Sequence, residues 1–176
     1  SDYISQYSDG AYRARALSLL LESAINRNKT DEALTYASEL VEKYPDNSLS
    51  EPAYIFKASA LYDSGDAEAA LSAWKALGQR ASSSKTLNAS RAGIMRAARD
   101  LGDYEAVAAA ADALLSSSTL GSEDKNEAVF SKALALSQTG NAADARELWS
   151  SIAGMTDDLY GAKSALFLAQ SYFDDS

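Results

Sequence analysis

A helix-ending motif that returns every 37 or 38 residues constrains this chain more than any other feature of its sequence. The motif is clearest at Gly65-Asp66, and taking Asn28, Gly65, Gly102 and Gly140 as markers gives steps of 37, 37 and 38 residues. Glycine readily adopts the left-handed conformation that ends a helix, and aspartate caps the exposed N–H groups of the next one. A period in this range is the signature of a repeat protein built from one small structural unit.

The segment around Gly65 indicates what that unit is. Apolar side chains recur at i, i+4 and i+7 on both sides of the joint, which predicts two amphipathic helices. These side chains are Tyr54, Ala58 and Leu61 before the joint, and Ala70, Trp74 and Leu77 after it. Because the connection is so short, the two helices are expected to lie antiparallel with their apolar stripes in contact. Trp74 and Trp149 are therefore expected in the core.

The apolar positions of this unit return in register with the other markers. In each second helix, a small or branched residue lies five positions after the marker, and a larger residue lies seven positions further on. The first set is Ala33, Ala70, Val107 and Ala145, and the second is Leu40, Leu77, Leu114 and Ile152. In the first helices, the positions equivalent to Tyr54, Ala58 and Leu61 are apolar except for Arg91. The sequence therefore predicts an all-α solenoid of antiparallel helix pairs.

The repeat also predicts how a single array divides along the chain. The expected ranges are 11–46, 48–81, 85–116 and 122–154 for four helix pairs, 158–176 for the first helix of a truncated fifth unit, and 1–9 for the end of a preceding helix. A stacked array that is cut at both ends exposes apolar surface unless capping repeats cover it. We therefore expect this chain to be an excised part of a longer array.

The charge and the residue content exclude several classes of function. The net charge is −9, which disfavours binding to DNA, RNA or an anionic membrane surface. No run approaches the roughly 18 apolar residues of a membrane-spanning helix, so direct membrane insertion is not expected. The sequence contains no Cys and no His, which removes thiol nucleophiles, Ser-His-Asp triads and the common zinc sites. We expect no catalytic residues, no metal and no cofactor.

The repeat resembles that of the tetratricopeptide repeat (TPR) family. The family pattern combines an early aromatic residue, a small residue one turn on, a Gly-Asp type of joint, a small residue where the helices touch, a large residue one turn later, and a closing proline. The matching residues here are Tyr54, Ala58, Ala133, Ala33, Ala70, Ala145, Trp74, Trp149 and Pro45. The units are longer than the usual length of about 34 residues, and Ala37 and Ala111 replace the large residue. Tyr44-Pro45-Asp46 resembles TPR proteins of the bacterial cell envelope, which would imply a periplasmic or outer-membrane-associated location.

The resemblance implies a right-handed superhelix whose concave face, lined by the first helix of each pair, binds a peptide or an extended segment of a protein partner. Carried over by register, the predicted partner-binding residues are Ile55, Ser59, Tyr62, Arg96, Arg99, Phe130, Leu134 and Phe167. A partner with an acidic side chain or a C-terminal carboxylate beside apolar side chains would suit this surface, because guanidinium groups pair bidentately with carboxylates.

Two interpretations of these residues stay open. In the first, they form the binding groove of a non-catalytic interaction scaffold. In the second, Phe130 and Phe167 pack between units, and Arg96 and Arg99 pair with Glu or Asp of a neighbouring helix. A different class of function would be a structural spacer or an assembly subunit of a cell-envelope complex, which binds through its convex face or its ends.

Overall fold

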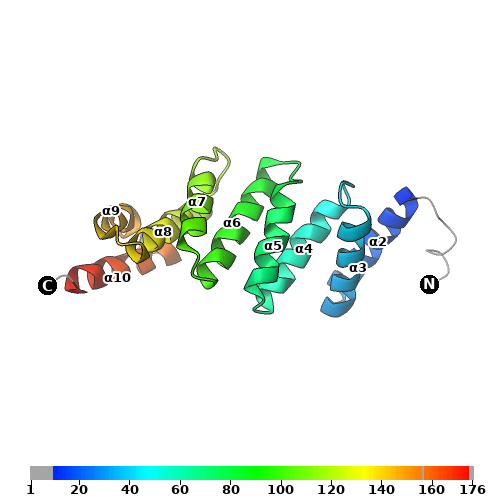
Figure 1. Cartoon of the computed structure of the whole chain (residues 1–176), viewed down its shortest axis with the longest axis horizontal. Helices are drawn as coiled ribbons and strands as arrows, with labels where there is room; N and C mark the ends of the chain where they lie inside the picture. The colour runs from blue at the N-terminus through cyan, green and yellow to red at the C-terminus, as the bar shows by residue number, and fades with distance from the viewer. Residues whose placement is uncertain (1–9, 156, 175–176) are drawn as a thin grey trace. The chain divides into compact units, whose positions relative to one another are not determined.

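The computed structural model describes residues 10–155 and 157–174, and these residues form α-helices joined by turns (Figure 1). The predicted end of a preceding helix at residues 1–9 lies outside the described residues. The helices are α2 (Gly10–Asn26), α3 (Thr30–Lys43), α4 (Ser50–Asp63), α5 (Ala67–Gly78), α6 (Ser84–Asp100), α7 (Tyr104–Leu115), α8 (Ser122–Gln138), α9 (Ala142–Ile152) and α10 (Leu159–Asp174). The described part of the chain contains no strand, so the all-α prediction is confirmed.

The four marker residues are the points at which a first helix turns into a second helix. Asn28, Gly65, Gly102 and Gly140 have φ angles of 55°, 85°, 72° and 88°, and they are the positive-φ residues of the described chain. In each case the N–H group of the following residue donates to the carbonyl five residues earlier, at 2.8 to 3.0 Å. This is the Schellman arrangement, which satisfies carbonyl groups that the end of a helix leaves unpaired.

The residue after the marker then starts the second helix in two of the four joints. The Asp66 carboxylate accepts a hydrogen bond from the Ala69 N–H at 3.0 Å, and the Asp103 carboxylate accepts one from the Ala106 N–H at 3.0 Å. Each carboxylate also lies at the positive end of the helix dipole, which adds to the capping. The Gly-Asp pair therefore ends one helix and begins the next, as the sequence predicts.

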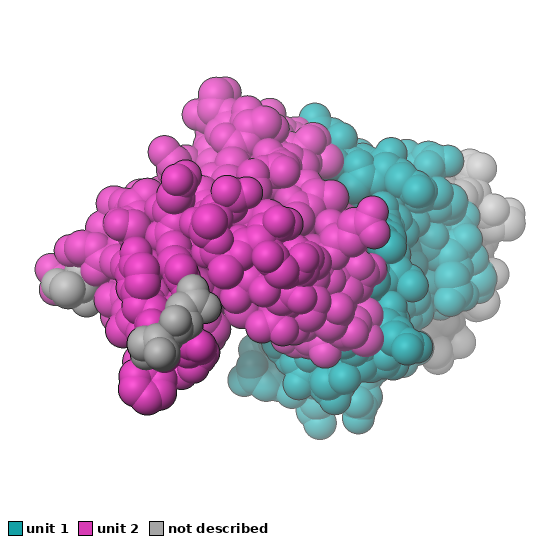
Figure 2. All heavy atoms as spheres, turned by 60° about the vertical axis from the view of Figure 1, so that its left-hand side comes forward, with its two compact units in different colours: residues 1–82 teal, residues 83–176 magenta. Residues whose placement is uncertain are grey.

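The helices form two compact units, which are described separately here (Figure 2). Unit 1 is residues 1–82 and includes α2 to α5, and unit 2 is residues 83–176 and includes α6 to α10. Within each unit, every helix packs against the next one along the chain. The first helices of successive pairs also touch, because α2 contacts α4 in unit 1, and α8 contacts both α6 and α10 in unit 2.

The core forms at the positions that the repeat predicts. The second-helix residues five and twelve positions after each marker are all buried: Ala33, Leu40, Ala70, Leu77, Val107, Leu114, Ala145 and Ile152. The first helices follow the rule less closely, because Leu61 and Leu136 are only half-buried. Arg91 is the polar exception in the pattern, and its guanidinium donates a hydrogen bond to the Ala113 carbonyl of α7 at 3.0 Å.

Large and small residues alternate at one core position of the second helices. Trp74 is 8% exposed and Trp149 is 1% exposed, which confirms the prediction that both belong to the core. Ala37 and Ala111 occupy the equivalent positions and are fully buried. The alanines leave room for side chains from neighbouring helices, so each pair is filled by a different combination of residues.

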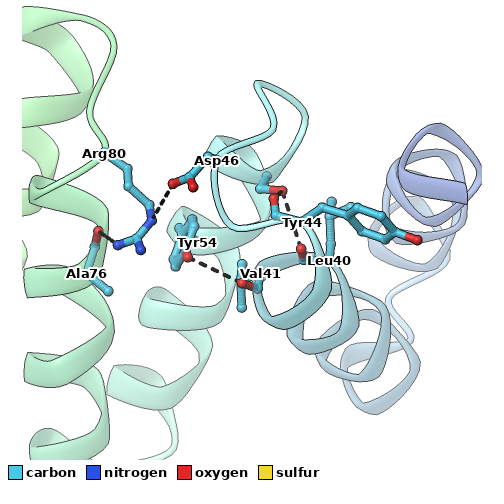
Figure 3. Close-up of polar contacts among 8 residues, drawn as sticks. Leu40, Val41, Tyr44, Asp46, Tyr54, Ala76 and Arg80 are labelled. Carbon is cyan, nitrogen blue, oxygen red and sulfur yellow. Dashed lines mark hydrogen bonds and ion pairs between the residues drawn. The ribbon is translucent and has the colours of Figure 1, made fainter. Parts of the chain in front are cut away.

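The connection between α3 and α4 in unit 1 is held by hydrogen bonds to the backbone (Figure 3). The Ser50 hydroxyl donates to the Tyr44 carbonyl at 2.6 Å, and the Tyr54 hydroxyl donates to a carbonyl of α3 at 3.4 Å. Arg80, which follows α5, pairs with Asp46 at 3.4 Å and lies over the Tyr54 ring at 5.6 Å. The Tyr-Pro-Asp turn is therefore tied both to the helix pair before it and to the pair after it.

Replacing Gly102 tests the left-handed joint. We expect Gly102→Ala to lower the free energy of unfolding by roughly 1–2 kcal/mol, because a Cβ atom is strained in this conformation. Gly102→Asn is expected to cost less, since Asn tolerates the conformation and already occupies it at position 28. Urea denaturation followed by circular dichroism measures both.

Gly154→Ala is the matched control for this substitution. A Cβ atom would meet no atom within 4 Å at Gly102 or at Gly154, but only Gly102 of these two has a positive φ. The control is expected to leave the unfolding midpoint nearly unchanged. Equal effects at the two positions would show that backbone strain is not what makes Gly102 necessary.

Candidate partner-binding face

The first helices of unit 2 bring five of the predicted site residues onto three neighbouring helices. Arg96 and Arg99 lie on α6, Phe130 and Leu134 on α8, and Phe167 on α10. Because α8 contacts both of the other helices, and Arg96, Arg99 and Phe167 each contact a side chain of α8, these residues lie on adjoining parts of unit 2. We refer to this surface of α6, α8 and α10 as the first-helix face.

A buried carboxylate organises the polar part of this face. Glu127, on α8, is 2% exposed. The guanidinium of Arg96 donates two parallel hydrogen bonds to the Glu127 carboxylate, from Nε to Oε1 at 2.8 Å and from Nη2 to Oε2. Tyr160 of α10 interacts electrostatically with the same carboxylate. One acidic side chain therefore links all three helices.

The contacts shift the pKa values of all three groups. Burial by itself raises the pKa of Glu127, but the interactions with Arg96 and Tyr160 and the charges of Arg96 and Arg99 hold it below its usual value. The hydrogen bond to Glu127 raises the pKa of Arg96. Burial and the interaction with Glu127 raise the pKa of Tyr160 to about 12. At neutral pH the cluster therefore consists of a carboxylate, a guanidinium and a neutral phenol.

Two more cations lie on the same face. Arg99 donates from Nη1 to the Ser131 hydroxyl at 3.3 Å. The Lys163 ammonium lies 5.3 Å from the centre of the Tyr160 ring and 6.0 Å from that of Phe130, which is the geometry of a cation–π contact. Arg99 and Lys163 therefore add two positive charges beside the buried carboxylate, and the exposed Asp124 carboxylate is close enough to Arg96 to contribute to its raised pKa.

The apolar part of the face is an aromatic cluster that packs between helices. Phe130 and Phe167 meet edge to face with ring centroids 5.3 Å apart, and Phe130 lies 5.8 Å from Tyr160. Trp149 of α9 lies 5.4 Å from Phe167. Phe130 is buried and Phe167 is half-buried. The packing role that the second interpretation assigned to both phenylalanines, and the carboxylate partner it assigned to Arg96, are therefore observed.

Three residues of this face were missed in the sequence: Glu127, Tyr160 and Lys163. Glu127 lies in a charged stretch, SEDKNE, where any of the acidic residues could face solvent. Lys163 precedes the predicted Phe167 by one helical turn, so helical spacing could have placed it on the same face. Nothing in the sequence distinguishes Glu127 from its neighbours.

The remaining predicted residues lie in unit 1, on α4. Ile55, Ser59 and Tyr62 recur at i, i+4 and i+7, so they share one side of the helix, and all three are half-buried. Arg13 of α2 and Lys43 both hydrogen-bond to Glu39, at 2.6 and 2.8 Å, and these contacts lower the pKa of Glu39. Unit 1 therefore has its own mixture of apolar and charged surface.

Other kinds of site have little support in the described residues. Within residues 10–155 and 157–174, no group of three or more acidic side chains is arranged to hold a metal ion. Within the same ranges, no helix combines the length and the apolar character needed to cross a membrane.

Comparison with solved structures finds the same fold in other repeat proteins. A tetratricopeptide repeat protein from Parabacteroides merdae matches with a TM-score of 0.71 and 14% sequence identity, over 92% of this chain and 60% of that chain. This chain therefore spans about three fifths of that protein's length. No protein-family model and no curated protein matches the sequence.

TPR-like repeats from Podosopora anserina give the same result. These nearly identical repeats, assigned to a kinesin light chain, match with a TM-score of 0.63 and 17% identity over 93% of this chain and 87% of that one. A point variant of them matches with a TM-score of 0.66 and 16% identity, over 96% and 89%. The chain has a TPR-like fold, as its repeat predicts.

Replacing Arg96 tests the buried ion pair. We expect Arg96→Met to lower the free energy of unfolding at pH 7, toward the lower end of the about 3–5 kcal/mol typical of a broken buried pair. The lower end applies because the Arg96 side chain is 39% exposed, so water screens part of the interaction. Urea denaturation at several pH values measures the loss.

The stability loss caused by Arg96→Met is expected to depend on pH, through the pKa of Glu127. In the unchanged protein the pKa of Glu127 is lowered by folding, so its stabilisation is present above the unfolded value of about 4.3 and is lost as the pH falls through the folded value. In the Arg96→Met variant, burial raises the pKa of Glu127. The loss of unfolding free energy should therefore be smaller at pH 5 than at pH 7. Adding Glu127→Gln should recover part of the loss at pH 7. A loss that is identical at both pH values would contradict the account.

Proposed function

We propose that this chain is a non-catalytic interaction module that binds a segment of a partner protein along its first helices, with the first-helix face of unit 2 as the main site. The half-buried residues of α4, Ile55, Ser59 and Tyr62, provide a second contact surface in unit 1. The TPR-like fold supports this class of function, because stacked helix pairs present a series of first helices on one side. The absence of Cys and His from the sequence argues against most kinds of catalysis.

The observation that carries the proposal is the way in which Arg96 is held. Its guanidinium is fixed by the buried Glu127 through two of its five N–H groups, yet the side chain is 39% exposed. Among the described residues, the other three N–H groups have no hydrogen-bond acceptor, so they are available to a ligand. Because the arginine is already ordered, a partner would not bear the entropy cost of fixing it. Arginine is enriched among the residues that dominate binding energy at protein interfaces.

The surroundings of Arg96 indicate the chemistry of the partner. Arg99 and the exposed Lys163 add two positive charges, and Leu134 and Phe167 are half-buried apolar residues of the same face. Guanidinium groups favour planar carboxylates, and apolar side chains beside them favour aliphatic or aromatic neighbours in the ligand. We therefore propose an acidic side chain or a C-terminal carboxylate next to an apolar residue as the segment that binds here.

Selection from a peptide library tests this proposal without knowledge of the partner. A library of random peptides is selected against the whole chain, and enriched peptides are measured by fluorescence polarisation. We expect enriched sequences in which Asp, Glu or a free C-terminus lies next to an apolar residue. The double variant Arg99→Glu and Lys163→Glu should bind them more than about tenfold more weakly, because two attractions become repulsions.

Lys85→Glu with Lys125→Glu is the matched control, because it changes the net charge by the same amount. Both lysines are exposed, in the first turns of α6 and α8. The control should retain most of the affinity, and circular dichroism should show equal helicity for all three proteins. If both double variants weakened binding equally, the effect would come from net charge alone. If the peptides bound the Arg99→Glu and Lys163→Glu variant with unchanged affinity, the binding surface would lie elsewhere.

A further inference from the structure

A polar contact joins each of three first helices to the turn that follows its own helix pair. In each case the first-helix residue lies fourteen positions before the marker, so the contact repeats with the joints. The contacts join Glu51 to the Ser82 hydroxyl at 2.6 Å, Asn88 to the Ser117 hydroxyl at 2.9 Å, and Asn126 to the Met155 sulfur at 3.4 Å. We refer to these three as the turn contacts.

The third turn contact has the weakest acceptor. The other two use a carboxylate or a hydroxyl oxygen, whereas the Asn126 amide donates to a thioether, which is a weak acceptor. The turn that contains this thioether also starts α10, because the Asp158 side chain accepts from the Tyr160 and Gly161 N–H groups, both at 2.9 Å. The Asp158 N–H in turn donates to the Met155 carbonyl at 3.1 Å. A stronger acceptor at position 155 would therefore attach the start of α10 more firmly to α8.

The side chain of Met155 is also accessible to small molecules in solution. The sequence contains two methionines and no cysteine. Met155 is 48% exposed, whereas Met95 is fully buried, and both tryptophans are buried as well. The equivalent turn after α7 is also open to solvent although three more helices follow it, since Ser117 is half-buried there between the exposed Ser116 and Ser118. An oxidant in solution therefore meets one sulfur atom of the folded chain far more readily than the other.

Oxidation of this thioether by hydrogen peroxide produces the acceptor that the turn lacks. A sulfur lone pair attacks one peroxide oxygen, and the O–O bond breaks as the S–O bond forms. The proton of the transferred hydroxyl ends on the second oxygen, which leaves as water, so the sulfur loses two electrons and the peroxide gains them. The product is methionine sulfoxide, whose oxygen is polar. The Asn126 amide already lies 3.4 Å from the sulfur, so it is placed to donate to an oxygen bonded to that sulfur.

We infer that Met155 is a site of reversible oxidation by peroxide, and that its sulfoxide strengthens the turn contact with Asn126. Oxidation of an exposed methionine ordinarily adds a polar group without a partner, but here the partner is already in place. The modification therefore fixes the turn between α9 and α10, and a methionine sulfoxide reductase would release it again. This inference is independent of the proposed peptide site, because neither Asn126 nor Met155 belongs to the predicted partner-binding residues.

Peroxide treatment of the whole chain, followed by peptide mass spectrometry, tests the selectivity of the oxidation. In the folded protein, Met155 should be oxidised more than about tenfold faster than Met95, because susceptibility follows exposure. In concentrated urea the two methionines should react at similar rates, which controls for their intrinsic reactivity. Equal rates in the folded protein would overturn the inference.

Amide hydrogen exchange of Asp158, measured by NMR before and after oxidation, tests the strengthened contact. Its N–H donates to the Met155 carbonyl, so it reports on the opening of this turn. Oxidation should slow its exchange about fivefold, the change expected of one net hydrogen bond. Reduction by a methionine sulfoxide reductase should restore the original rate.

Asn126→Ala is the matched control, because it removes the donor and leaves the methionine in place. This variant should be oxidised at Met155 as fast as the unchanged protein, but its Asp158 amide should not exchange more slowly afterwards. Two results would overturn the inference: an oxidised protein in which this exchange is unchanged or faster, or an Asn126→Ala variant that shows the same slowing. Circular dichroism of each protein before and after oxidation excludes unfolding as the cause.

Discussion

The left-handed residue at the joint within each helix pair is the constraint on which the rest of the structure depends. A helix that ends with a left-handed residue and a Schellman pair of hydrogen bonds reverses the chain within two or three residues. The second helix must then lie against the first, and the residues five and twelve positions later face inward. Asn28 and the three glycines set this geometry at steps of 37, 37 and 38 residues, so the core repeats with the same period.

The buried carboxylate of Glu127 imposes a second constraint, one that acts between pairs. Taking a carboxylate out of water is costly unless cations and hydrogen bonds replace its hydration. Arg96 from α6 supplies a cation and two hydrogen bonds, and Tyr160 from α10 interacts with the same carboxylate, so Glu127 links the three first helices of unit 2. The same contacts hold an arginine in a defined position on a surface that remains partly open to solvent. Stability and the proposed binding chemistry therefore rest on the same residues.

The sequence was most informative where the structure depends on local rules. The joints, the capping by Asp66 and Asp103 and the buried positions of the second helices follow from backbone preferences and helical spacing alone. The roles of Glu127 and Tyr160 could not be predicted, because they depend on how helices about 30 residues apart are rotated against each other, whereas the spacing of Lys163 to Phe167 could have placed it. Leu61 and Leu136 show the same limit, since their spacing is right but the neighbouring helices leave them half-buried. The partner-binding role of the first-helix residues stays a prediction.

Amide hydrogen exchange, followed by NMR, tests the central role of the joints most directly. The N–H groups of Lys29, Asp66, Asp103 and Asn141 belong to exposed residues, yet each donates to a carbonyl five residues earlier. We expect all four to exchange much more slowly than the amide of Ser118, an exposed turn residue for which the structure shows no such bond. Exchange at the rate of Ser118 in all four would contradict the account, because the joints would then not be the ordered points that set the repeat.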